Sequence, residues 1–251
     1  MEKHIRFKND TDETLTGTLH FPEGPFARGI VLAHCFTCSR HTTIPRELGN
    51  ALARAGYLAL RFDFSGNGQS QGRFEETTFT KQIGEMKRAI EVITHEGVSW
   101  IGLAGHSMGA EVAVLTASDT PEVRGVAAVA GRLSGLKPTH FLDVKQIEQL
   151  RQTGYVEFTS RGRNLRLNQA FFSDANKQDL PAVLRTLERP LMILHGEKDD
   201  IVPAAEARRA ASMNPERIEL VMLPRADHMF LRPEDRLQAV GAIVDLFNRL
   251  D

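Results

Sequence analysis

The chain has 251 residues, and its 31 Lys and Arg nearly balance its 32 Asp and Glu. This length suits one compact domain that needs no disulfide or metal staple, and 41% hydrophobic residues is ordinary for a globular protein. The charge balance argues against a nucleic-acid partner, and no apolar run approaches the ~18 residues of a membrane span.

The chain opens with two segments, 2–8 and 14–21, in which polar and apolar residues alternate. This alternation predicts an antiparallel β-hairpin. The first segment also lacks the apolar stretch of a secretory signal peptide. Because the chain has only two cysteines as well, we expect a cytoplasmic protein.

After the hairpin, short apolar runs alternate with helix-like stretches. The apolar runs predict strands at 29–33, 57–62, 100–104, 125–130, 191–194 and 219–223. The helix-like stretches lie at 43–55, 79–95, 107–118, 203–213 and 233–250. Continuous apolar strands that alternate with helices are typical of a buried parallel sheet. We therefore predict an α/β fold with a mostly parallel central sheet flanked by helices.

The segment 132–189 interrupts this rhythm. Within it, 145–153 suits a helix, and 155–158 with 163–167 suits a small hairpin that turns at Arg161 and Gly162. A connection of this length usually has its own structure or a function. We therefore predict a core made of residues 1–131 and 190–251, with 132–189 inserted as a small lid over the carboxyl edge of the sheet.

The sequence GHSMG at 105–109 follows the apolar run 100–104 and opens a predicted helix. A serine at such a strand-to-helix turn holds its hydroxyl above the sheet, and the flanking glycines avoid a collision within the turn. Free N–H groups at the start of the helix also favour developing negative charge. We predict that Ser107 is a nucleophile; the alternative is an ordinary glycine-rich turn.

A serine nucleophile needs a base and an orienting carboxylate, here expected in the chain order Ser, Asp, His. Asp199 lies in the polar loop after the predicted strand 191–194, and His228 lies in the loop after 219–223. We predict that His228 is the general base and that Asp199 orients it. The neighbouring Asp200 is a weaker candidate for the acid.

Three further polar residues invite a catalytic reading but favour a structural one. His106 precedes the serine and should point into packing, and His195 ends a strand and suits a structural role at the turn. Asp63 begins a glycine-rich loop, 63–70, that lacks the lysine of a phosphate-binding P-loop. We expect Asp63 to stabilise that turn.

The loop after the predicted strand 29–33 should supply a backbone N–H to the oxyanion, and the residue after the nucleophile should supply the second. We assign these donors to Phe36 and Met108. Within the lid, Phe141, Phe171 and Phe172 are candidates to line an apolar substrate pocket, although they suit the core of the lid equally well.

Cys35 and Cys38 form a C-x-x-C pair flanked by His34 and His41. This pattern allows a dithiol redox pair or a zinc site with His, Cys, Cys and His ligands. The redox motif normally precedes a helix in a much smaller core, and the zinc spacing is tight. We favour two small thiols that pack in the loop, and we predict no metal and no cofactor.

Together these motifs resemble α/β-hydrolase-fold serine esterases, in particular short-lid bacterial carboxylesterases and cinnamoyl (feruloyl) esterases. The sequences AHCFTCS at 33–39 and RFDFSG at 61–66 also resemble the hydrolase part of proteins fused to an OsmC-like peroxidase domain. The resemblance spans nearly the whole chain, least securely 132–189. It implies an α/β-hydrolase fold, with Ser107, Asp199 and His228 at the triad positions.

Two departures from that family limit the resemblance. Cys35 replaces the glycine usual after the histidine of the esterase loop, which could change the geometry of that loop. No OsmC-like domain follows, so a peroxidase role of that fusion partner does not transfer.

We therefore predict a carboxylesterase that cleaves small-molecule esters through an acyl-enzyme, without nucleic-acid or membrane partners. Thioesterase, lactonase, amidase and perhydrolase activities would use the same residues, and feruloyl esters are a specific alternative. The oligomeric state stays open. Two other classes remain: a non-catalytic relative that binds a ligand, and a redox or zinc protein built on Cys35 and Cys38.

Overall fold

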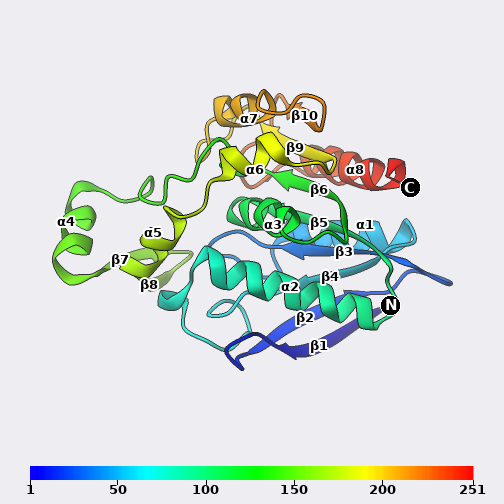
Figure 1. The fold of residues 1–251 in the computed structure, drawn as a ribbon, viewed down its shortest axis with the longest axis horizontal. Helices are drawn as coiled ribbons and strands as arrows, with labels where there is room; N and C mark the ends of the chain where they lie inside the picture. Colours follow the sequence, from blue (N-terminus) through cyan, green and yellow to red (C-terminus); the bar gives the residue numbers. More distant parts are fainter. Residues whose placement is uncertain (251) are drawn as a thin grey trace.

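A computed structural model describes residues 1–250 of the chain. Its main sheet has eight strands in the order β1-β2-β4-β3-β5-β6-β9-β10, and β7 and β8 form a separate two-stranded sheet. The strands are β1 (Glu2–Lys8), β2 (Thr14–His20), β3 (Arg28–Ala33), β4 (Leu58–Phe62), β5 (Trp100–His106), β6 (Val123–Val129), β7 (Tyr155–Ser160), β8 (Arg163–Asn168), β9 (Leu191–Gly196) and β10 (Ile218–Leu223). Figure 1 shows the main sheet at the centre of the molecule.

The main sheet is parallel except at the β1–β2 edge. β1 pairs antiparallel with β2 and β2 pairs antiparallel with β4, whereas the strands from β4 to β10 pair in parallel. The chain passes from β3 to β4 on one side and returns to β5 on the other side of β3. Loops diverge at such a switch point and leave a crevice at the carboxyl ends of the strands. The predicted fold class is confirmed.

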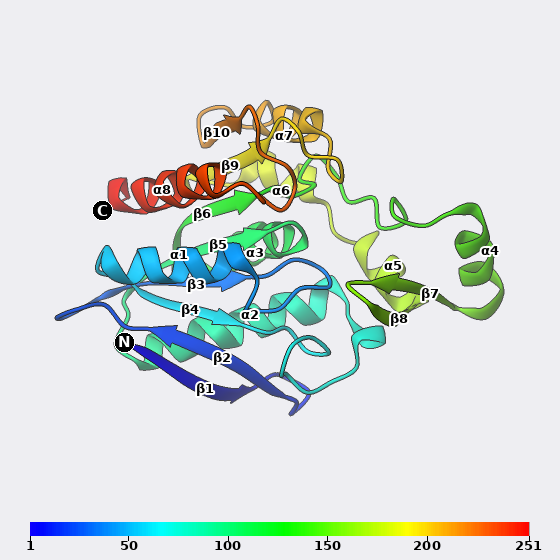
Figure 2. The same ribbon diagram turned by 180° about the vertical axis from the view of Figure 1, so that it is seen from behind.

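Helices cover both faces of this sheet, as Figures 1 and 2 show. In β3, Val31 and Ala33 contribute to one hydrophobic core, while Ile30 and Leu32 contribute to the core on the opposite face. This alternation follows from the two-residue period of a strand. The first core receives α2 (Phe79–His95), α3 (Met108–Ser118), α6 (Leu180–Thr186) and α7 (Ala204–Ala211), and the second receives α1 (Thr43–Arg54) and α8 (Pro233–Arg249).

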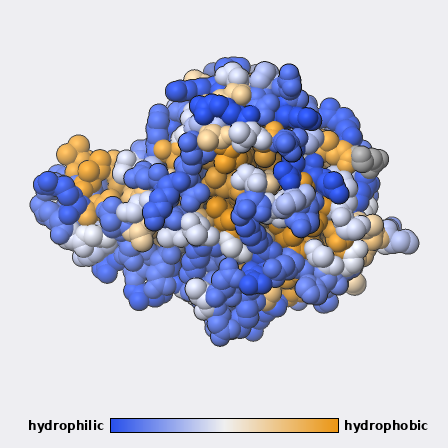
Figure 3. All heavy atoms as spheres, in the orientation of Figure 1, coloured by the Kyte–Doolittle hydropathy of each residue, from blue (hydrophilic) through white to orange (hydrophobic). Residues whose placement is uncertain are grey.

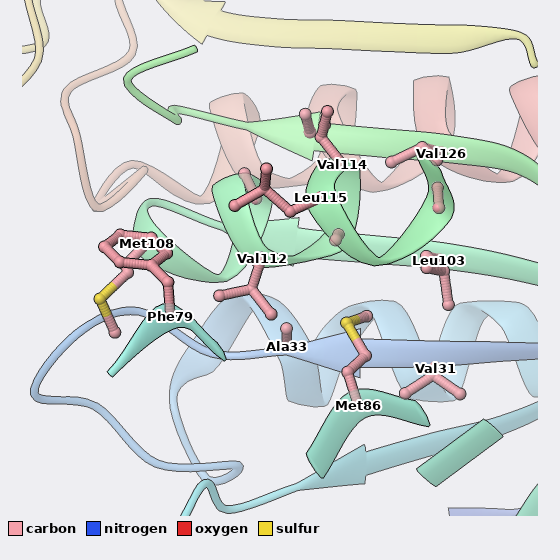
Figure 4. Packing of buried hydrophobic residues seen from close by; sticks show 14 of the residues in the cluster. Val31, Ala33, Phe79, Met86, Leu103, Met108, Val112, Val114, Leu115 and Val126 are labelled. Carbon is pink, nitrogen blue, oxygen red and sulfur yellow. The ribbon is translucent and has the colours of Figure 1, made fainter. Parts of the chain in front are cut away.

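Helix α3 is buried over nearly its whole length, from Met108 to Ala117. It packs against β3, β5 and β6, and it is covered by α2 and α6. Figure 4 shows Val112 of α3 beside Ala33 of β3, with Met86 of α2 nearby. A helix enclosed on all sides needs apolar residues around its full circumference. The start of α3, which carries Ser107, is therefore fixed on every side.

The segment 132–189 connects β6 to β9 and contains α4 (Val144–Thr153), the β7–β8 hairpin, α5 (Gln169–Ala175) and α6. The sequence predicts α4 and the hairpin but not the two short helices. For α6 a local signal exists: the Asp179 side chain accepts the Ala182 N–H, and Pro181 occupies the first turn.

In Figure 3 the projecting end of this segment shows apolar atoms, and Val144 and Ile147 of α4 are exposed. No helix within residues 1–250 has the length and apolar character needed to cross a membrane.

Asp63 is fully buried at the end of β4 and organises the loop that follows. Its carboxylate accepts the Arg40 N–H at 2.6 Å and the Gln69 N–H at 2.9 Å, and it forms a salt bridge with the Arg40 guanidinium. Gly68 has φ +53°, and a Cβ there would lie 2.2 Å from Asp63 Oδ2. The predicted turn-stabilising role of Asp63 is confirmed.

We expect Asp63→Ala to lower the free energy of unfolding by about 3–5 kcal/mol, because it leaves the buried Arg40 guanidinium uncompensated. Chemical denaturation followed by circular dichroism measures this loss. Asp119→Ala is the control, because Asp119 pairs with Lys87 on the surface, where such a pair contributes about 0–1 kcal/mol. Equal losses in the two variants would contradict the assignment.

Candidate active site

Ser107 lies between β5 and α3 in a backbone conformation that side chains rarely adopt, with φ 56° and ψ −123°. Its N–H donates to Val129 O at 2.8 Å. A Cβ at position 105 would lie 2.0 Å from Gly109 O, and a Cβ at position 109 would lie 2.6 Å from His34 O. Both glycines are therefore required by close backbone approach, as the GHSMG pattern predicts.

Ser107, His228 and Asp199 form one hydrogen-bonded series. His228 Nε2 lies 3.1 Å from Ser107 Oγ, and His228 Nδ1 lies 2.8 Å from Asp199 Oδ2. Because a carboxylate only accepts, Nδ1 carries the proton and a neutral ring leaves Nε2 free to accept from the serine. The structure thus brings together the three residues that the sequence predicts as a triad, from positions far apart in the chain.

Two neighbouring loops hold the acid and the histidine close together. The Lys198 N–H in the loop after β9 donates to Ala226 O in the loop after β10 at 3.0 Å. Gly196 permits this contact, because a Cβ there would lie 2.1 Å from Ala226 O. Asp227 then accepts the Met229 N–H at 2.9 Å and closes the turn around His228.

The Asp199 carboxylate is fully buried and has four hydrogen-bond donors. Oδ1 accepts the backbone N–H groups of Ile201 at 2.9 Å and Val202 at 2.7 Å, while Oδ2 faces the rings of His228 and His195. Burial opposes ionisation, but the hydrogen bonds from His195 and His228 outweigh it and hold the pKa of Asp199 well below its usual range. Asp200, the weaker candidate for the acid, is exposed.

His195 has a contact that the sequence did not reveal. Its Nε2 lies 2.9 Å from Val202 O and 3.1 Å from Asp199 Oδ2, so the proton on Nε2 is shared between two acceptors. The hydrogen bond to Val202 O agrees with the predicted structural role of His195 at the turn. The contact with Asp199 adds a positioning role, because it fixes the same oxygen that His228 uses.

His106 points into packing, as predicted, and it also secures the loop of His228. Its Nε2 lies 2.8 Å from His228 O, so Nε2–H is the donor. Burial, together with the neighbouring His228 ring, lowers the pKa of His106 to about 3. The neutral His106 ring therefore adds no positive charge next to Ser107. Its hydrogen bond also fixes the backbone of His228.

The loop after β3 passes directly over the start of α3. Buried His34 fixes it: Nε2 accepts the Phe64 N–H at 3.1 Å, and Nδ1, which must then carry the proton, donates to Cys35 O at 2.7 Å. Within residues 1–250, neither the Phe36 N–H nor the Met108 N–H donates to a protein acceptor. Both groups are therefore available to a ligand beside Ser107, as expected for the two predicted oxyanion donors.

Cys35 and Cys38 are joined by a disulfide. The expectation of two free thiols packed in the loop is wrong, because the Cys38 N–H donates to Cys35 O at 3.0 Å in a tight turn that brings the side chains together. In the described part of the chain, no group of three His, Cys, Asp or Glu side chains is placed to hold a metal ion.

A cavity of about 400 Å³ opens beside Ser107 and His228. Phe141 and Phe171 line it, whereas Phe172 does not and packs in the core at a right angle to the Phe171 ring. Phe172 is thus a core residue of the inserted segment, the other reading that the sequence allows. The lining further includes the apolar Phe36, Phe79, Met108 and Leu136, and the polar Glu111, Arg132, Lys137, His140 and Arg161.

Glu111 is a carboxyl on the wall of this cavity that the sequence analysis missed. It lies one helical turn after Ser107, is 8% exposed, and accepts the Arg132 N–H at 3.0 Å. Burial raises the pKa of Glu111 to about 8, against the smaller opposing effect of Arg132. The side chain is therefore mainly protonated at neutral pH. The sequence did contain a signal for this residue: Glu111 lies four residues after the nucleophile, on a helix that has no polar face.

We expect Glu111→Gln to stabilise the fold by roughly 2–4 kcal/mol at pH 8. The unfolded side chain ionises near 4.5 and the folded one near 8, so the folded state holds an extra proton between these values and stability falls as pH rises across that window. Urea unfolding of both proteins between pH 4.5 and 8 measures this slope. The same slope in the variant would contradict the assignment.

Comparison with known proteins gives curated relatives over most of the chain. Mouse mitochondrial palmitoyl-protein thioesterase ABHD10 is 26% identical over 202 residues, which cover 78% of this chain and 67% of that protein. The chain spans about two thirds of the length of such curated relatives.

Solved structures show the same fold. The esterase domain of a Rhodothermus marinus protein is 26% identical with a TM-score of 0.76, covering 99% of this chain and 98% of its own. Est1E from Butyrivibrio proteoclasticus, solved with ferulic acid bound, is 19% identical with a TM-score of 0.85, covering 98% of both chains. The model of the alpha/beta hydrolase family matches residues 30–240. The chain therefore belongs to the alpha/beta hydrolase family.

Proposed function

We propose that this protein hydrolyses carboxylic esters through an acyl-enzyme formed on Ser107. The observation that carries the proposal is the hydrogen-bonded series from Ser107 through His228 to Asp199, which opens into a cavity beside two unoccupied N–H donors. Nucleophile, base and orienting acid within hydrogen-bond reach are the geometry that acyl transfer requires.

The reaction begins when Ser107 Oγ attacks the ester carbonyl and His228 Nε2 takes the hydroxyl proton. Asp199 holds the ring in the tautomer that accepts this proton and stabilises the resulting imidazolium. The carbonyl oxygen becomes an oxyanion, which accepts from the Phe36 and Met108 N–H groups; one such donor is typically worth about 10²–10³ in rate.

The tetrahedral intermediate then collapses to the acyl-enzyme, and water hydrolyses the acyl-enzyme with the help of the same groups. His228 protonates the leaving alcohol oxygen, the C–O bond of the ester breaks, and the acyl group remains on Ser107. His228 next takes a proton from water, which attacks the acyl carbonyl and releases the acid, and the proton returns to Ser107. The segment 132–189 supplies Phe141 and Phe171 to the cavity, which supports its proposed role as a lid.

Thioester hydrolysis is the second candidate, because mouse ABHD10 is named as a palmitoyl-protein thioesterase, while Est1E was solved with ferulic acid bound. The aromatic wall formed by Phe36, Phe79, Phe141 and Phe171 suits an aryl or alkyl acyl group of either type. The cytoplasmic location stays a prediction, and so does the small-molecule nature of the substrate.

We expect Ser107→Ala to lower kcat on 4-nitrophenyl esters by at least about 10⁴-fold, because the nucleophile is lost. A chain-length series from acetate to decanoate, with methyl ferulate and an acyl thioester alongside, measures activity and class together. Ser118→Ala at the far end of α3 is the control and should retain full activity. Turnover that survives in Ser107→Ala, or a fluorophosphonate label on another residue, would overturn the proposal.

Two adjacent carboxylates offer a sharper test of the triad. We expect Asp199→Asn to lower kcat by about 10³–10⁴-fold, because the amide can no longer hold His228 in the accepting tautomer. Asp200→Asn removes the same charge one residue away on the surface and should leave kcat within about two-fold. Similar activities of the two variants would show that Asp199 is not the orienting acid.

A further inference from the structure

Arg161 reaches from the tip of the β7–β8 hairpin into the wall of the catalytic cavity. Its Nη2 lies 3.6 Å from Met229 Sδ and 4.0 Å from Cys35 Sγ. Met229 directly follows His228, and Cys35 directly precedes Phe36, so the guanidinium contacts the sequence neighbours of the proposed base and of a proposed oxyanion donor, and it lines the same cavity as both. Sulfur is a weak acceptor, and these contacts leave the donor capacity of the guanidinium largely unused.

The hairpin tip is held in this place by its own turn and by the loop after β3. Arg161 has φ 50° and Gly162 has φ 72°, so two left-handed residues form a tight two-residue turn. Beside it, Ser160 Oγ lies 2.8 Å from Thr37 Oγ1, and Arg163 Nη2 donates to Thr37 O at 2.9 Å. Figure 2 shows the hairpin next to that loop.

The charges on the cavity wall do not neutralise Arg161. The other two lining cations, Arg132 and Lys137, lie 3.2 and 3.3 Å from the same carboxylate oxygen of Glu206. Glu111, the carboxyl on the wall, is mainly protonated at neutral pH, and burial lowers the pKa of His140, which favours its neutral ring. Among the described residues, no carboxylate lies within ion-pair distance of Arg161.

We propose that Arg161 forms an anion subsite of this cavity, so that the preferred substrates are esters carrying a carboxylate or a similar oxyanion near the scissile bond. The inference rests on the proposed ester hydrolysis and names its substrate class. A carboxylate would replace the two sulfur contacts with charge-assisted hydrogen bonds, which are stronger than bonds to sulfur. The neutral Glu111 would not repel it.

The test uses two pairs of esters that differ by one negative charge. 4-Butyryloxybenzoate and its methyl ester place the charge in the leaving group, whereas mono(4-nitrophenyl) adipate and 4-nitrophenyl hexanoate place it in the acyl group. Each pair is assayed with wild type, Arg161→Gln, Arg161→Lys and the control Arg166→Gln. Arg166 lies on the same hairpin but pairs with Glu157. Ratios between proteins cancel the intrinsic reactivities of the esters.

We expect Arg161→Gln to lower kcat/KM about ten-fold for the anionic member of at least one pair, through KM, and less than about two-fold for the neutral members. Arg161→Lys should keep part of the preference, Arg166→Gln all of it, and added salt should weaken it in wild type. The affected pair tells whether acid or alcohol carries the charge.

An equal loss on both members of each pair, or no change on any ester, would overturn the anion subsite and leave ester hydrolysis intact. Ser107→Ala on the neutral esters tests the other proposal separately: activity that survives there removes the hydrolase mechanism, and with it the inference drawn from it.

Discussion

The site depends on one close backbone contact, that of the start of α3 with the strand before it and the loop beside it. Gly105 lies against Gly109 O, and Gly109 lies against His34 O. A Cβ at either position would collide with that carbonyl oxygen. This contact forces Ser107 into its left-handed conformation and directs its hydroxyl to the carboxyl edge of the sheet. A strained residue persists only where its surroundings over-determine it, and the buried helix α3 provides those surroundings.

The polar groups around this contact follow one electrostatic pattern. Asp199 is the ionised carboxyl, kept so by donors on both of its oxygens, whereas Glu111 is a neutral carboxyl in an apolar wall. His106 and His34 are neutral rings whose donors and acceptors fix the loops of His228 and Phe36. The two acids thus differ in charge because one has several donors and the other has a single N–H partner. Environment, rather than residue type, separates their roles.

Sequence reasoning predicted the regular framework and the three hydrogen-bonded residues, because each leaves a local signal. Apolar runs identify the strands, GHSMG identifies the turn, and the loops after β9 and β10 identify Asp199 and His228. The contacts of His195 with Asp199, and of Arg161 with Cys35 and Met229, depend on side-chain directions between distant segments. Pairing of Cys35 with Cys38 was considered but not favoured, because the tight turn that brings the two side chains together has no mark in composition. Phe171 and Phe172 are adjacent and equally apolar, and only the helix orientation assigns one to the cavity.

The hydrogen bonds of Ser160 and Arg163 to Thr37 join the inserted hairpin to the residue that follows Phe36. Substrate recognition and rate acceleration would therefore be mechanically linked: a displacement of the hairpin would move Thr37 and, with it, the adjacent Phe36, whose N–H is a proposed oxyanion donor. A changed hairpin sequence that accommodates a bulkier ligand would have to keep the hydrogen bonds to Thr37 or replace them with other contacts. Selectivity and turnover in this enzyme are thus expected to change together rather than independently.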